Sequence, residues 1–115
     1  MLYVDFKAGD NDYKLRLATR NIVALEKALG GNPLSIFGNG ESIPSITAMT
    51  NILFCSLQQY QHGITYEKAC DIFDDYLTEN SMTDFITVIL DIYKVSGIMK
   101  DSTKDENEKN AVAGK

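Results

Sequence analysis

Apolar and polar residues alternate in two short stretches near the N-terminus. In residues 2–7 leucine, valine and phenylalanine occupy every second position, and in residues 13–17 Lys14 and Arg16 lie between apolar neighbours. A period of two is typical of a β-strand with one buried face. The intervening residues 8–12 are rich in types that tolerate turn geometry. The pattern predicts an N-terminal β-hairpin.

Helical spacing follows the hairpin. Thr19 can cap a helix whose apolar residues recur at intervals of three and four, namely Ile22, Leu25 and Leu29. Two glycines and then Pro33 provide a stop signal.

A brief apolar cluster comes next. It contains Leu34, Ile36 and Phe37, enough for one helical turn, and precedes a Gly-Asn-Gly loop over residues 38–40. Such a loop is expected to be exposed and mobile.

Pro44 and Ser45 predict the start of a second helix, because proline fixes the entry of the chain and serine offers a capping hydroxyl. The helix is expected to end near residues 62–63. Its apolar face contains Ile46, Met49, Ile52, Leu53, Leu57 and Tyr60.

Two more helices have hydroxyl caps at their predicted starts. Thr65 precedes the third, and Ser81 precedes the fourth, where Asp84 supports the first turn. The buried faces are expected to contain Ala69, Ile72, Phe73, Tyr76 and Leu77 in the third helix, and Phe85, Ile86, Ile89, Leu90, Ile92 and Tyr93 in the fourth.

Residues 100–115 are polar, with no aromatic or β-branched aliphatic side chain before Val112. This composition predicts a disordered polar tail. The chain is therefore expected to be an α+β, mostly α protein. An N-terminal β-hairpin and about four helices form one domain over residues 1–99, and the tail follows it.

The net charge of −5 is unevenly distributed. Residues 65–93 contain seven acids and only one base, Lys68, whereas residues 1–64 contain five of each. A concentrated negative field repels phosphate, so we expect binding to neither nucleic acid nor anionic membranes. No apolar stretch approaches the roughly 18 residues of a membrane span.

Cys55 and Cys70 lie in segments with helical spacing, so the expected role of both thiols is that of small buried hydrophobes. A single disulfide in a secreted chain is the alternative. The N-terminal residues show no basic segment followed by an apolar run, so no signal peptide is expected. A reducing cytoplasm is the expected compartment.

The chain offers little for catalysis or metal binding. Cys55, His62 and Cys70 would lack a fourth zinc ligand and the usual ligand spacings. Carboxylates on successive turns of the third helix lack the glycine and terminal glutamate of a calcium loop. The glycine pair before Pro33 has no lysine-serine or lysine-threonine pair after it, and no serine has an evident base. We therefore expect no enzyme, no cofactor and no metal site.

The order of segments resembles that of a known protein family. Residues 15–37 read LRLATRNIVALEKALGGNPLSIF, in which a hairpin leads into a helix ending in Leu-Gly-x-Asn-Pro and then a brief apolar turn. The similarity continues through Ile-Pro-Ser-Ile-Thr at residues 43–47 and an acidic segment at residues 63–77. In these features the chain resembles the tail assembly chaperones of long-tailed bacteriophages and prophages of Gram-positive bacteria, over roughly residues 2–99.

The resemblance implies a non-enzymatic protein of the host cell cytoplasm that acts in virion morphogenesis and is absent from the mature virion. Such chaperones bind the tape measure protein and the major tail (tube) protein. A longer product made by ribosomal frameshifting is common in the family, and the polar tail would suit a linker to it.

Two groups of residues are candidates for binding partners. The first is the apolar cluster, Leu34, Ile36 and Phe37, which could cover apolar helices of a client, although packing in the core is an alternative role. The second is the acidic group Asp71, Asp74 and Asp75, for which a solvated helix face is the alternative. Self-association would let weak contacts add along an elongated client. A different function also remains open, that of a small acidic helical regulator that binds a DNA-binding protein as a nucleic-acid mimic.

Overall fold

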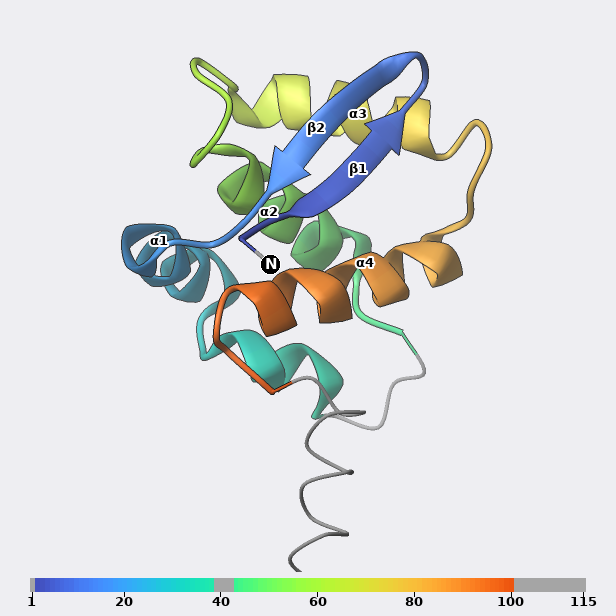
Figure 1. Cartoon of the computed structure of the whole chain (residues 1–115). Helices are drawn as coiled ribbons and strands as arrows, with labels where there is room; N and C mark the ends of the chain where they lie inside the picture. The colour runs from blue at the N-terminus through green and yellow to red at the C-terminus, as the bar shows by residue number, and fades with distance from the viewer. Residues whose placement is uncertain (1, 39–42, 101–115) are drawn as a thin grey trace, which may run out of the picture.

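A computed structural model describes residues 2–38 and 43–100, which form a two-stranded antiparallel hairpin and a set of helices (Figure 1). The elements in chain order are β1 (Val4–Ala8), β2 (Asn11–Leu15), α1 (Thr19–Leu29), the 3₁₀ helix η1 (Pro33–Phe37), α2 (Ile46–Leu57), α3 (Tyr66–Tyr76) and α4 (Met82–Val95). The predicted α+β, mostly α class with an N-terminal hairpin and four α-helices is confirmed for the described residues.

The hairpin turn is shorter than predicted. Val4 pairs with Leu15 and Ala8 with Asn11, so only Gly9 and Asp10 remain between the strands. Gly9 has a φ of 62°. Two-residue hairpin turns need a positive φ at this position, and glycine adopts it without strain. The prediction placed Asn11 and Asp12 in the turn, whereas they belong to β2.

The cap of α1 differs from the prediction as well. Thr19 is the first residue of the helix and is exposed, so its hydroxyl does not cap it. Instead, Asn21 reaches back with its side-chain oxygen and accepts a hydrogen bond of 3.0 Å from the Ala18 main-chain N–H. The predicted stop is confirmed, because Gly30 adopts a φ of 75° and donates its N–H to the Glu26 carbonyl.

Helix α2 lies at the centre of the fold and is buried on most of its sides, where it packs against α1, α3, α4 and β2. The prediction of a helix with one apolar face and an end near residues 62–63 is wrong. The helix ends at Leu57, and both Ile46 and Tyr60 are exposed.

The other three predicted hydroxyl caps are confirmed. Ser45 accepts a hydrogen bond from the Ala48 N–H, Thr65 from the Lys68 N–H and Ser81 from the Asp84 N–H. The Asp84 carboxylate in turn accepts from the Ser81 N–H, which completes a capping box. These caps fix where α2, α3 and α4 begin.

An aromatic cluster joins the hairpin to α3 and α4. Phe6 of β1 stacks on Tyr76 at 4.9 Å between ring centroids and meets Phe85 edge-on at 6.0 Å. Phe85 also meets Phe73 edge-on at 5.0 Å and lies fully buried. Aromatic pairs with this geometry stabilise a core beyond the area that they bury.

Side-chain hydrogen bonds attach the strand segment to distant helices. The Arg16 guanidinium donates through Nη1 to the Leu2 carbonyl at 2.9 Å and to the Val95 carbonyl at 2.8 Å. The Leu17 N–H donates to the Ser96 hydroxyl at 2.9 Å. The chain leaving β2 is therefore held against the C-terminal end of α4.

Two predictions fall largely on residues that the structure does not describe. Of the loop over residues 38–40 only Gly38 is described, and of the polar tail over residues 100–115 only Lys100. Within the described ranges, no helix combines the length and the apolar character needed to cross a membrane.

Candidate partner-binding site

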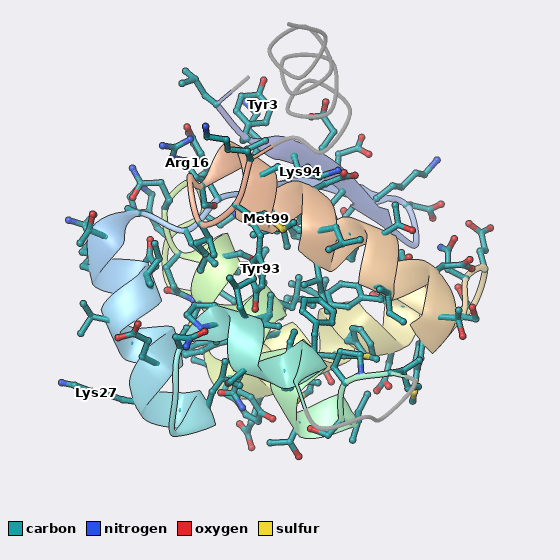
Figure 2. The ribbon with its side chains drawn as sticks, turned by 90° about the horizontal axis from the view of Figure 1, so that it is seen from below. Tyr3, Arg16, Lys27, Tyr93, Lys94 and Met99 are labelled. Carbon is teal, nitrogen blue, oxygen red and sulfur yellow. The ribbon has the colours of Figure 1, made fainter. Side chains whose placement is uncertain are left out.

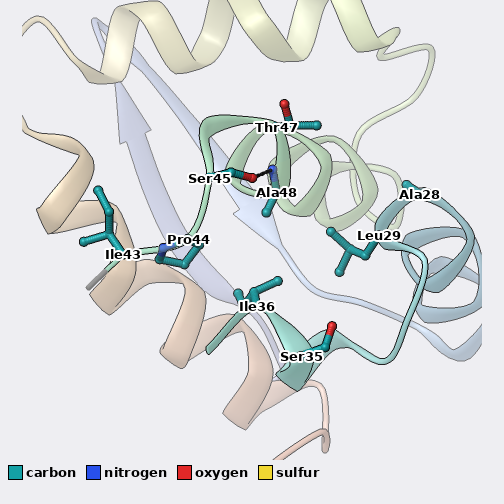
Figure 3. A pocket seen from close by; sticks show the side chains of 9 residues that line it. All are labelled: Ala28, Leu29, Ser35, Ile36, Ile43, Pro44, Ser45, Thr47 and Ala48. Carbon is teal, nitrogen blue, oxygen red and sulfur yellow. Dashed lines mark hydrogen bonds between the residues drawn. The ribbon is translucent and has the colours of Figure 1, made fainter. Parts of the chain in front are cut away.

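A pocket of about 510 Å³ opens where α1, η1 and the start of α2 meet (Figure 3). Its walls come from the C-terminal end of α1, from η1, and from the segment that enters α2. The lining residues are Ala28, Leu29, Ser35, Ile36, Ile43, Pro44, Ser45, Thr47 and Ala48. No side chain in this described set carries a charge, and aliphatic side chains line the pocket together with the hydroxyl-bearing Ser35, Ser45 and Thr47.

One wall of the pocket, η1, is held by a local cap and by contacts with α4. Asn32 caps it by accepting a hydrogen bond of 2.8 Å from the Leu34 N–H. The buried Tyr93 hydroxyl of α4 donates to the Pro33 carbonyl at 2.8 Å, and the Phe37 ring meets the Tyr93 ring edge-on. Figure 2 shows Tyr93 among the interior side chains between α4 and η1, and burial raises the pKa of its hydroxyl. The hydroxyl therefore remains a donor, and η1 is held in place.

The structure places the three predicted apolar residues on this short helix in two different settings. Ile36 is half-buried and points into the pocket (Figure 3), whereas Leu34 and Phe37 are 43% and 39% exposed. Leu34 and Phe37 are three residues apart and therefore share one side of the 3₁₀ helix. The alternative of core packing applies in part, because Ile36 packs against the core and the Phe37 ring contacts the buried Tyr93 ring.

The other walls of the pocket come from residues that were not predicted to bind a partner. Ile43, which is 37% exposed, and Thr47 come from the entry to α2, and Leu29 comes from the end of α1. A local signal existed for Ile43, because an isoleucine directly before a predicted helix start is a candidate for an exposed apolar residue. We refer to Leu34, Ile36, Phe37 and Ile43 as the η1 patch.

Two of the hydroxyl groups in the pocket, those of Ser35 and Ser45, are engaged in local hydrogen bonds. Ser35 donates to the Asn32 carbonyl at 2.6 Å, and Ser45 caps α2. Across residues 2–38 and 43–100, no three His, Cys, Asp or Glu side chains lie close enough together to hold a metal ion.

The acidic residues Asp71, Asp74 and Asp75 all lie exposed on α3. Asp75 lies beside the hairpin turn, where a Cβ on Gly9 would be 3.5 Å from the Asp75 Cβ. Figure 1 shows α3 and η1 on opposite sides of α2. The two predicted groups of partner-binding residues therefore belong to separate surfaces.

The other candidate residues are also dispersed. His62 is exposed after the end of α2. Both thiols are free, Cys55 buried in α2 and Cys70 half-buried in α3. The expectation of a buried thiol thus holds for Cys55 and only in part for Cys70.

The two thiols should differ strongly in reactivity. Burial raises the pKa of the Cys55 thiol from 9.0 to about 11. At pH 8 this shift lowers the thiolate fraction roughly a hundredfold, and it is the thiolate that reacts. We expect iodoacetamide to label Cys70 in the native protein and to label Cys55 at least about a hundredfold more slowly. Mass spectrometry of the labelled peptides, with the urea-unfolded chain as the control, measures both rates, and equal native rates would contradict the burial of Cys55.

Comparison with known proteins places the chain in one family. No curated protein and no solved structure matches it. A family model does match, over residues 4–114, and thus covers the hairpin and all of the helices described above. Its description is a family of unknown function, and the chain belongs to this family, DUF6096.

Proposed function

We propose that this protein is a phage tail assembly chaperone that binds the tape measure protein and the tail tube subunits during tail morphogenesis and is absent from the mature virion. The observation that carries the proposal is the η1 patch, in which Ile36 and Ile43 line the pocket and Leu34 and Phe37 are exposed on the same short helix as Ile36. The resemblance of residues 15–37 and 43–47 to tail assembly chaperones adds support, since these are the segments that build the patch.

The mechanism in this proposal is shielding of an apolar client. A helix of the client would insert an apolar side chain into the pocket, beside Ile36, and cover Leu34 and Phe37 with its flanks. One contact of this size is weak. Many copies bound along an elongated client would add their affinities, and the covered surface would be withheld from aggregation.

The proposal includes no enzymatic step. It draws support from the hydroxyls of Ser35 and Ser45, which serve as local hydrogen-bonding groups, and from the exposed position of His62, which is not among the residues that line the pocket. In this proposal the protein only binds its partners.

Co-expression with the tape measure protein tests the proposal. A chain with Leu34→Asp and Ile43→Asp places two charges on the η1 patch. Because charges at an apolar contact must be desolvated, we expect the soluble fraction of the tape measure protein to fall at least about fivefold relative to the unchanged chain.

The matched control is Tyr60→Asp. Tyr60 is 37% exposed, as Ile43 is, but it lies beyond the C-terminal end of α2, whereas Ile43 precedes the N-terminal end. This control should keep the client soluble. A tape measure protein that is equally soluble without any copy of this chain would refute the chaperone function. An effect of Tyr60→Asp equal to that of the double variant would refute the role of the η1 patch.

A further inference from the structure

The two outer edges of the hairpin differ in the hydrogen bonds that their main-chain groups form with the rest of the protein. On the β2 edge, the side-chain amide of Gln61 binds the main chain of Lys14 from both ends. Its Oε1 accepts from the Lys14 N–H at 2.8 Å, and its Nε2 donates to the Lys14 carbonyl at 2.9 Å. The amide thus pairs with β2 as a neighbouring strand would, and it closes this edge at Lys14. Two residues further along the chain, the Arg16 N–H donates to the Ser56 carbonyl of α2 at 3.0 Å.

The same two hydrogen bonds establish which groups β1 presents on its own outer edge. Since the N–H and C=O of Lys14 point away from β1, Lys14 and its partner Asp5 form a pair without mutual hydrogen bonds. Pairs of this kind recur every second residue, so Lys7 and Asp12 form the next. The N–H and C=O groups of Asp5 and Lys7 therefore point away from β2.

These groups on the β1 edge are open to a partner. Within the described part of the chain, no hydrogen bond reaches the main-chain N–H or C=O of Asp5 or Lys7, and both residues are exposed. Unpaired groups along a strand edge form a template for another strand. The acidic and basic side chains at these positions select which strand fits.

The sequence of β1 is complementary to itself in one antiparallel register. With Phe6 opposite Phe6 of a second copy, Asp5 lies opposite Lys7 of that copy, and Lys7 opposite its Asp5. A shift of two residues in one direction would place Asp5 opposite Asp5, and in the other direction Lys7 opposite Lys7. Opposite charges in facing positions stabilise a sheet and like charges destabilise it, so a single register is favoured.

We propose that the β1 edge is a self-association surface at which a second copy of this chain pairs antiparallel, with Phe6 at the two-fold axis. The two hairpins then form one four-stranded sheet. On the exposed face of this sheet, one row of side chains crosses the four strands. It contains Lys14 and Asp5 of one copy, followed by Lys7 and Asp12 of the second copy, so basic and acidic side chains alternate. The contact is isologous, which gives a closed dimer. This proposal does not depend on the chaperone function.

A pair of single substitutions tests the register. A chain with Asp5→Lys has two bases on its edge, and a chain with Lys7→Asp has two acids. Each alone places like charges opposite each other twice, so we expect each homodimer to dissociate at a roughly tenfold higher concentration than the unchanged dimer. Mixed in equal amounts, the two chains place opposite charges together and should form a dimer again. Sedimentation equilibrium measures all three samples, and a mixture no more associated than its components would overturn the proposal.

Amide hydrogen exchange of the unchanged chain provides an independent readout. The Asp5 and Lys7 amides should exchange rapidly in dilute solution and slow at least about tenfold as the concentration rises into the dimeric range. The Phe6 amide, which points toward β2, is the internal control and should change less. A chain that remains monomeric at millimolar concentration, or dimerises without protecting Asp5 and Lys7, would also overturn the proposal.

Discussion

Replacing Phe85 with alanine is expected to lower the free energy of unfolding by about 3–5 kcal/mol. The side chain is fully buried and lies edge-on to Phe6, Phe73 and Tyr76, so its removal leaves a cavity at the junction of β1, α3 and α4. Domains of this size have total stabilities of only about 5–15 kcal/mol. Urea unfolding followed by circular dichroism should show a much lower midpoint.

Phe37→Ala is the matched control for this prediction. It removes the same ring from a position that is 39% exposed, so the loss should be smaller than that of Phe85→Ala by at least about 1.5 kcal/mol. Equal losses at the two positions would mean that the aromatic cluster does not form the core of the protein.

Tyr93→Phe is expected to have the second largest effect. The substitution removes one oxygen and leaves the Pro33 carbonyl buried without its donor, at a cost of about 1–3 kcal/mol. The loss should act on η1 first, because this hydrogen bond attaches η1 to α4. We therefore expect the amides of η1 to exchange faster, along with a lower global stability.

The appropriate comparison is Tyr66→Phe. The Tyr66 hydroxyl also forms one hydrogen bond, to Thr50 at 2.8 Å, but the residue is 41% exposed, so water can replace the missing partner. Tyr66→Phe should therefore lower the free energy of unfolding by less than about 1 kcal/mol. If exchange at η1 is unchanged in Tyr93→Phe, the attachment of η1 has been misassigned.

Local hydrogen bonds explain which parts of the fold were predictable. Ser45, Thr65 and Ser81 each bind an N–H only three residues away, and this short-range chemistry is visible in the sequence. The same chemistry also explains an error. Thr19 and Asn21 are both capping types near one helix start, and the structure uses Asn21 from inside the helix.

Tertiary contacts explain what the sequence could not reveal about α2. Its apolar spacing continues to Tyr60, which favoured a longer helix. The helix ends earlier, and the residues that follow bind elsewhere: Gln58 donates to the Ile64 carbonyl and Gln61 pairs with Lys14. A partner 47 residues away leaves no periodic signal in the sequence.

In the candidate site, too, the residues that are close in sequence could be predicted, and those brought together by tertiary contacts could not. Leu34, Ile36 and Phe37 are adjacent in sequence and were identified as a cluster, but their settings differ, because only Ile36 faces the pocket. Ile43 and Leu29 reach the pocket through the packing of α2 and α1 against η1, so only the folded arrangement brings them together. The acidic residues were assigned to one helix face correctly, but their separation from η1 by α2 could not be read from the sequence.

The hydrogen bonds that join Arg16 and Leu17 to the C-terminal end of α4 constrain the order in which the protein folds. These hydrogen bonds span 79 residues, so they can form only after almost the whole domain has been synthesised. Contacts between residues so far apart in the sequence form more slowly than local ones, because the loop between them must be closed first. During synthesis on the ribosome, the hairpin and the first helices therefore lack the side chains of α4 that complete their core. We expect the domain to complete its folding in one late, cooperative step, after α4 has emerged.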